Sequence, residues 1–140
     1  MIRIQREPIS VDDVLAAVRS PGSGATAVFL GTVRNHSHGK SIVKLEYEAY
    51  ENMAEKELAR VESEVKERWP VLGTAFVHRL GVMMIGEVSV ALAVSTAHRK
   101  DAFEACRYAI DRIKQVVPIW KTETTQEGTY IIEGEEAHRG

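Results

Sequence analysis

The chain has 140 residues, 44% hydrophobic and 27% charged, with a formal net charge of -2 at pH 7. This size and composition are typical of one globular domain with a substantial core, here residues 1–140. A charge so close to zero excludes a general basic field of the kind that binds nucleic acid. The N-terminus lacks the apolar run of a signal peptide, and no segment approaches the roughly 20 apolar residues of a membrane helix. We therefore expect a cytoplasmic protein with neither a membrane nor a nucleic-acid partner.

Strand and helix patterns alternate in the first half of the chain. Ser10, followed by two aspartates, is typical of a helix start, and Pro21-Gly22 closes that helix. Apolar residues at 3-4 spacing predict an amphipathic helix that Pro70 stops. The predicted order is a strand at 2–4, a helix from 10, a strand at 25–34, a polar loop at 35–41, a strand at 42–50 and a helix at 53–69.

The second half of the chain predicts two strands, a long helix and a hairpin. The strands are expected at 74–80 and 88–96 with a glycine-bounded connection between them, the helix at 99–117, and the hairpin strands at 119–124 and 129–133. Residues 134–140 are polar and are expected to form a flexible tail. Because the helices lie between strands without strict βαβ repetition, the class is predicted as α+β.

The helix at 99–117 has an apolar seam and a cationic row. The seam is predicted to face the core and comprises Phe103, Cys106, Ile110, Ile113 and Val117. Three cations spaced by seven residues form a row beside it, namely Lys100, Arg107 and Lys114. Cys106, the single cysteine, is interpreted as a buried, inert thiol that forms no internal disulfide.

Both ends of this helix carry candidate site residues. His98 and Arg99 lie where a strand gives way to the helix, and a helix N-terminus suits an anion. Lys114 lies in the last turn, and Lys121 follows after Pro118 and Trp120. Lys114 and Lys121 can therefore approach one pocket from two elements, where desolvation or a neighbouring ammonium would make an amine a base or nucleophile. Together with Trp120, these features suggest a pocket for a flat, phosphorylated molecule.

The other candidates are weaker. Arg34 ends a buried strand, a place where sites collect. His36 and His38 could hold a metal, but two ligands without a third are weak, so a surface loop is the preferred interpretation and no metal site is expected. His78 is interpreted as structural.

Four ordered motifs resemble the large, catalytic subunit of molybdopterin synthase. They are FLGTVRNH at 29–36, LEYEAY at 45–50, STAHR at 95–99 with AFE at 102–104, and Lys114 followed by PIWK at 118–121. The resemblance runs from about residue 2 to residue 133. It implies an α/β-hammerhead-type fold with a mixed or antiparallel sheet, two long helices and a C-terminal β-hairpin.

The resemblance also implies a reaction and a set of partners. Two sulfurs would pass in succession from the C-terminal Gly-Gly thiocarboxylate of a small ubiquitin-like sulfur-carrier subunit to cyclic pyranopterin monophosphate, which becomes molybdopterin. The chain would form the homodimeric core of a heterotetramer and need no cofactor. Carried over by position, Lys114 and Lys121 are the catalytic lysines, and Arg34, His98 and Arg99 line the substrate pocket.

One departure from the family pattern concerns the neighbouring subunit. Some relatives carry an arginine shortly after the final strand that reaches the neighbour's site, whereas this chain has Glu133, Glu135 and Glu136 there, with Arg139 the nearest arginine.

The predicted dimer would also cover the edge of the terminal hairpin. Two alternatives remain open on the residues alone: a non-catalytic adaptor for a ubiquitin-like Gly-Gly tail, and a phospho-ligand binding protein.

Overall fold

The computed structural model describes residues 1–37, 40–125 and 128–133 of the chain. Within that part the helices and strands follow one another in an α+β order. The helices are α1 (Val11–Ala17), α2 (Glu51–Arg68) and α3 (Arg99–Val116). The strands are β1 (Ile2–Gln5), β2 (Ala25–Thr32), β3 (His36–Ser37), β4 (Lys40–Ala49), β5 (Val71–Arg79), β6 (Gly81–Met83), β7 (Val88–Thr96), β8 (Ile119–Thr125) and β9 (Gly128–Glu133).

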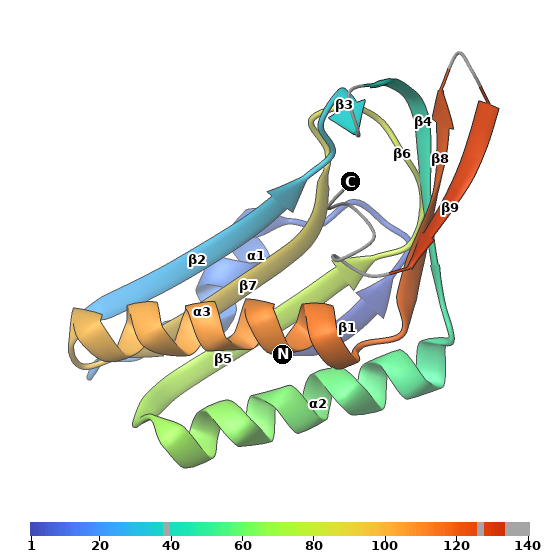
Figure 1. Cartoon of the computed structure of the whole chain (residues 1–140). Coiled ribbons are helices and arrows are strands. Elements are labelled where there is room, and N and C mark those ends of the chain that lie inside the picture. Colours follow the sequence, from blue (N-terminus) through green and yellow to red (C-terminus); the bar gives the residue numbers. More distant parts are fainter. Residues whose placement is uncertain (38–39, 126–127, 134–140) are drawn as a thin grey trace.

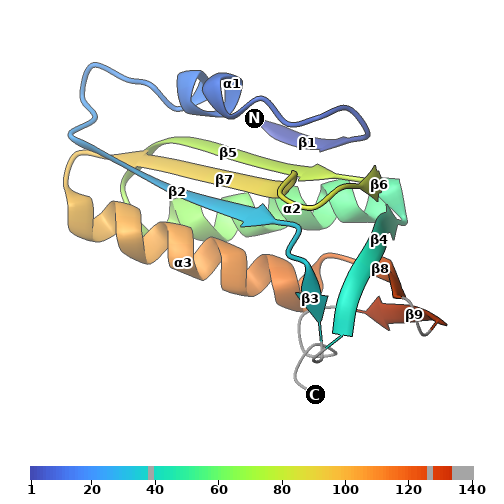
Figure 2. The ribbon, with the colours of Figure 1, turned by 90° about the horizontal axis from the view of Figure 1, so that it is seen from above.

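The first sheet has the order β1-β5-β7-β2 and is covered on both faces. β1 pairs with β5 in parallel, and the other pairs are antiparallel. The long helices α2 and α3 cover one face and the short α1 the other (Figures 1 and 2). Phe76 and Leu92 face the long helices, whereas Val77 and Ala93 face α1. Burial on both sides explains the nearly continuous apolar runs of β5 and β7.

The second sheet stands at the end of the first, where α3 ends (Figure 1). Its order is β3-β4-β8-β9, and β6 pairs with β4. Val117 is extended, with φ -80° and ψ 123°, as expected of a residue before proline. The chain therefore leaves α3 at Val117, passes Pro118 and enters β8 at once, which ties the helix end to the second sheet.

The predicted α+β class, long helices and terminal hairpin are confirmed, but two short strands were missed. β3 and the start of β4 fall in the predicted polar loop, and β6 falls in the predicted connection between β5 and β7. Both short strands pair with β4, so their conformation comes from tertiary pairing, which local periodicity does not report. Residues 126–127 of the hairpin turn and the tail at 134–140 lie outside the described residues.

The predicted seam of α3 is wrong at Phe103, whose side chain is 67% exposed. Cys106 and Ile113 are buried as expected. The rest of the buried stripe consists of small residues, namely Ala102, Ala105 and Ala109. The small alanine side chains let the helix lie close to β2 and β7. The prediction gave more weight to large apolar residues and therefore assigned the neighbouring Phe103 to the buried face.

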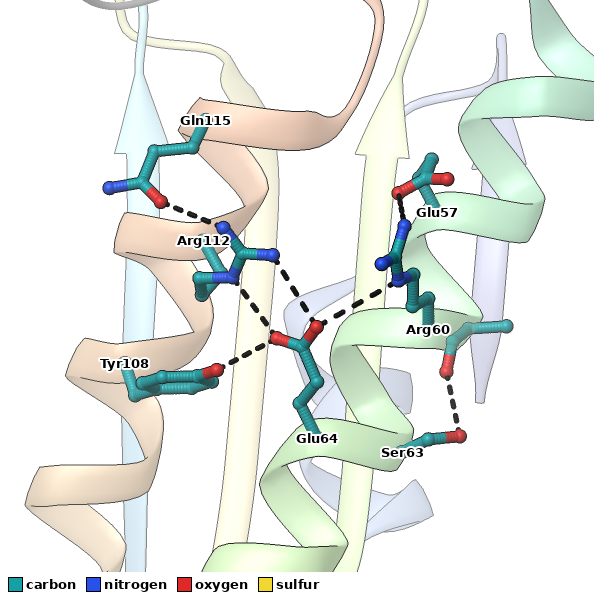
Figure 3. A network of polar contacts seen from close by, with 8 residues as sticks. Glu57, Arg60, Ser63, Glu64, Tyr108, Arg112 and Gln115 are labelled. Atoms are coloured by element: carbon teal, nitrogen blue, oxygen red, sulfur yellow. Dashed lines mark hydrogen bonds and ion pairs between the residues drawn. The ribbon is translucent and has the colours of Figure 1, made fainter.

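A polar network joins the two long helices α2 and α3 (Figure 3). Glu64 of α2 accepts hydrogen bonds from Tyr108 Oη at 2.8 Å and Arg112 Nε at 3.0 Å. Arg112 also donates to Gln115 at 2.9 Å. These two donors, Arg112 first, hold the pKa of Glu64 below its usual value. The network fixes the C-terminal turns of α3, which carry Lys114, against α2.

Glu64→Ala is expected to lower the free energy of unfolding by about 1–2 kcal/mol, because Arg112 and Tyr108 lose their common acceptor in a partly exposed position. Urea titration measures the loss, and Glu67→Ala on the exposed side of α2 is the matched control. A double-mutant cycle with Arg112→Ala should give a coupling energy clearly above zero. Additive effects would mean that the network contributes no specific interaction.

Candidate active site

Lys114 and Lys121 lie on either side of the turn from α3 into β8. Lys114 belongs to the last turn of α3 and is exposed. The side chain of Lys121, the third residue of β8, is only 17% exposed. One lysine is therefore exposed, and the other is nearly buried.

Lys121 lies on the inner face of the second sheet. In the β4–β8 register Tyr47 is opposite Lys121 and Leu45 is opposite Glu123, so these four side chains share one face. Leu45 packs there with Val33, Met83 and Tyr47 in a small apolar cluster. A cation on such a face needs a partner, and Lys121 Nζ lies 3.4 Å from Oε2 of Glu123, whose side chain is 4% exposed.

Burial and the neighbouring Glu123 act on the pKa of Lys121 in opposite directions. Burial lowers the pKa of Lys121, and the positive charges of Lys114 and Arg34 lower it further, while Glu123 acts in the opposite direction. Lys114 and Arg34 therefore lie close enough to Lys121 for their charges to act on it. The structure thus brings three of the five predicted site residues together.

Arg34 reaches this cluster from the end of β2. Val33 before it is buried, and its backbone is held on both sides: Val33 N–H donates to Glu87 O at 3.0 Å, and Gly86 N–H donates to Val33 O at 2.7 Å. The exposed side chain of Arg34 is therefore attached to a backbone that these hydrogen bonds hold in place. Arg34, Lys114 and Lys121 together form a site suited to a phosphate or a developing oxyanion.

His98 and Arg99 lie at the opposite end of α3. At a rise of about 1.5 Å per residue, Arg99 and Lys114 are about 22 Å apart along the helix axis. Both His98 and Arg99 are exposed, and the His98 side chain makes no capping hydrogen bond. Within one chain, the structure does not bring these two residues to the lysine cluster.

The predicted place of Trp120 beside the lysines is wrong. Successive residues of a strand point to opposite faces, so Trp120 lies on the outer face of β8 when Lys121 lies on the inner one. The indole packs there against Tyr50, with ring centroids 5.1 Å apart. The aromatic ring near the lysine cluster is instead that of Tyr47.

Sequence reasoning did not select Glu123 and interpreted His78 as structural. The i, i+2 spacing of Lys121 and Glu123 on a predicted strand could have revealed the pair, because such residues share a face. His78 is 6% exposed, and its ring meets that of Tyr47 edge-on at 5.5 Å. No local pattern shows that contact, since it joins the two sheets.

The remaining candidates are the two histidines of the predicted loop and the single thiol. Among those residues no three His, Cys, Asp or Glu side chains gather as metal ligands. His38 lies outside the described residues, and His36 belongs to β3. Cys106 is buried, and burial raises the pKa of its thiol to about 11, in line with the predicted inert role. Among the described helices none is long and apolar enough to span a membrane.

Comparison with known proteins places the chain in a family. The family model described as "MoaE protein" matches residues 4–116. The chain belongs to the MoaE family. It is 49% identical over 125 residues to the molybdopterin synthase catalytic subunit of Halalkalibacterium halodurans, covering 89% of this chain and 80% of that one. It is 46% identical over 129 residues to the human molybdopterin synthase catalytic subunit, covering 92% and 69%.

Solved structures agree with this family assignment. Molybdopterin synthase from Staphylococcus aureus superposes with a TM-score of 0.87 at 44% identity, covering 91% of this chain and 93% of that one. A complex of subunits 1 and 2 of molybdopterin-converting factor from Helicobacter pylori shares the fold, with a TM-score of 0.76 at 24% identity over 97% and 92% of the two chains. The predicted family, the predicted fold and the prediction that the chain is a molybdopterin synthase catalytic subunit are confirmed.

His78 should make stability depend on pH. Burial lowers its pKa to about 4 from 6.5, with a smaller contribution from Lys114. Between pH 6.5 and pH 4 His78 is protonated in the unfolded chain but stays neutral in the folded chain. The free energy of unfolding therefore falls as the pH drops toward 4. Between pH 7 and pH 5 the wild type should lose about 2 kcal/mol more than His78→Gln.

Urea titrations at the two pH values measure this difference, and carboxylate effects common to both proteins cancel. His98→Gln, at an exposed histidine, is the control and should follow the wild type. Parallel profiles for wild type and His78→Gln would contradict the burial of a neutral imidazole.

Proposed function

We propose that this chain transfers two sulfurs in succession from the C-terminal thiocarboxylate of a small ubiquitin-like subunit to cyclic pyranopterin monophosphate, yielding molybdopterin. The observation that carries the proposal is the joint position of Lys114, Lys121 and Arg34 in a chain of the MoaE family. The alternatives, an adaptor for a Gly-Gly tail and a phospho-ligand binding protein, would not need a buried lysine held by a buried carboxylate. A cytoplasmic location stays a prediction.

Each of the three cations has a distinct role in this proposal. Lys114, which is exposed, acts as the acid or base on the reacting groups. Lys121, more buried and paired with Glu123, stabilises the oxyanion that develops on the acyl group of the tail. Arg34 binds the phosphate of the pterin. Because the tail arrives already activated as a thiocarboxylate, the chain needs no cysteine nucleophile, which fits the buried Cys106.

The partner subunit is proposed to approach with an extended tail. Two terminal glycines without side chains can pass through a narrow channel and bring a carbonyl carbon close to Lys114. The structure from Helicobacter pylori contains subunits 1 and 2 of molybdopterin-converting factor in one complex, which supports a small-subunit partner for this chain as well. One such partner at each end of a homodimer gives the predicted heterotetramer.

A homodimer also gives His98 and Arg99 a place in the site. β2 ends the first sheet in the described order, and its side chains Val28 and Leu30 are 40% and 39% exposed. Antiparallel pairing of β2 with its copy would lay the start of one strand beside the end of the other. The start of β2 lies beside Thr96, just before His98, and the end leads to Arg34. Each lysine cluster would then receive His98 and Arg99 from the neighbouring copy.

In the described strand order β9 ends the second sheet, and a dimer contact at this edge, which the sequence predicts, serves the purpose less well. A contact there would leave His98 and Arg99 of both copies far from either lysine cluster. The exposed Phe103, on the helix that packs over β2, also favours the β2 contact, since a large apolar side chain in solvent gains from being covered.

Lys114→Ala should nearly abolish dithiolene formation from a thiocarboxylated partner and the cyclic precursor, with the thermal midpoint unchanged because Lys114 is exposed. Lys121→Ala should cost less activity, since its role is electrostatic. Lys100→Ala, on the same helix and also exposed, is the matched control and should retain wild-type turnover. A folded Lys114→Ala variant with most of its activity would remove Lys114 from the catalytic role.

The shared site can be tested by mixing two damaged variants. Lys114→Ala and Arg99→Ala should each be poor enzymes at low precursor concentration, Arg99→Ala through the loss of a phosphate contact worth on the order of 1.5–3 kcal/mol. If the site spans the dimer, random reassociation gives mixed dimers with one intact site, and about a quarter of all sites become active. Activity of the mixture no greater than the mean of the two variants would place both residues in one copy's site or in none.

A further inference from the structure

We propose that Glu87 is a positioning residue for Arg34: its carboxylate holds the turn between β6 and β7, and that turn fixes the backbone from which the Arg34 side chain reaches the site. The inference deepens the proposed function, on which it rests for the role of Arg34 in phosphate binding. The contacts of Glu87 itself do not depend on that reaction.

The regular pairing of β2 ends before Arg34. The register between β2 and β7 shifts at residues 31–32, where β2 ends. Beyond that point Val33 N–H donates to Glu87 O at 3.0 Å, and Gly86 N–H donates to Val33 O at 2.7 Å. Both partners of Val33 belong to the turn between β6 and β7. The turn is therefore what holds the backbone immediately before Arg34.

Glu87 closes this turn with its backbone and with its side chain. Its N–H donates to Met84 O at 3.1 Å, and its Oε1 accepts the Met84 N–H at 2.7 Å. Its Oε2 accepts from Arg79 Nη1 at 2.7 Å, and the Arg79 side chain is only 11% exposed. Because Arg79 is the last residue of β5, the carboxylate ties the turn to the first sheet. These two donors, Arg79 first, hold the pKa of Glu87 below its usual value.

The tip of the turn has little packing of its own. Met84 and Ile85 are 66% and 51% exposed. Gly86 has a φ of +87°, and apart from its chain neighbours no atom lies within 4 Å of the place of a Cβ there. Met83, the last residue of β6, is buried and anchors only the start of the turn. The rest of the turn depends on the hydrogen bonds of the Glu87 carboxylate.

Fixing the backbone at Val33 favours phosphate binding by Arg34. The Arg34 side chain is long and exposed, and every additional freedom of its backbone adds to the entropy that phosphate binding must remove. The negative charge of Glu87 acts in the opposite direction, because a carboxylate repels a phosphate. Loss of Glu87 therefore separates the two effects: its charge alone predicts tighter phosphate binding, and its positioning role predicts weaker binding.

Inorganic phosphate tests this role without turnover. In labelled protein the Nε–Hε NMR signal of Arg34, assigned by its loss in Arg34→Lys, should shift when phosphate is added. The phosphate concentration at half shift should rise about tenfold in Glu87→Ala. It should rise about threefold in Glu87→Gln, whose amide oxygen can still accept the Met84 N–H. Glu57→Ala removes another arginine-paired carboxylate, on α2, and as the matched control should behave like the wild type.

Amide hydrogen exchange measures the anchor itself. The exchange rate of the Val33 amide should rise about tenfold or more in Glu87→Ala, whereas that of Leu92, which pairs on both sides in the same sheet, should not change. With the cyclic precursor the same variant should raise KM about tenfold and keep kcat within about threefold of the wild type.

Equal or tighter phosphate binding in Glu87→Ala, or an unchanged exchange rate of Val33, would overturn the proposal. If Glu87→Ala does not fold, Glu87→Gln decides the question, and wild-type values of both measurements in that variant would overturn it as well. A wild type that binds phosphate at Arg34, with the expected losses in the variants but no dithiolene product, would contradict the proposed function and still support the role of Glu87.

Discussion

The nearly buried Lys121 is the constraint on which the rest of the site depends. A cation on the inner face of a sheet loses its hydration, and Glu123 two residues away on the same face offsets that cost. The pair requires a closed environment, which β4, β6 and the end of the first sheet supply through the cluster of Val33, Leu45 and Met83. The second sheet is small, but it creates the low-dielectric surroundings in which Lys114 and Arg34 can influence Lys121.

The position of α3 determines where Lys114 lies relative to Lys121. The helix cannot slide along the first sheet, because Glu64 holds Arg112 and Tyr108 from α2, and its alanines lie close to β2 and β7. Pro118 then turns the chain into β8 within two residues of the helix end. Lys114 and Lys121 are thus fixed relative to each other by backbone continuity, and a displacement of either element would move both.

The sequence predicted the long elements and the two lysines but not the inner face of the site. α2, α3, β7 and the hairpin have strong periodic patterns over many residues, and Lys114 and Lys121 stand in motifs with recognisable spacing. β3 and β6 escaped prediction because pairing with β4 alone makes them strands. Phe103 and Trp120 were misplaced for a different reason: large apolar side chains were assumed to face the core or the ligand, and here alanines and Tyr47 take those places.

In the proposed site, the distance between the two ends of α3 leaves a single copy of this chain incomplete. Arg99 and Lys114 are about 22 Å apart along a rigid helix, which cannot bend to bring them together. The hydrogen bond from Arg112 to Glu64 of α2 also holds this helix in place. A two-fold axis through the middle of β2 solves the problem without any conformational change, since it exchanges the ends of both β2 and α3. The same operation would cover Val28 and Leu30, which are the apolar residues that β2 leaves exposed. Assembly and substrate binding then depend on one surface, so a change that weakens the dimer should also weaken binding of the phosphorylated substrate.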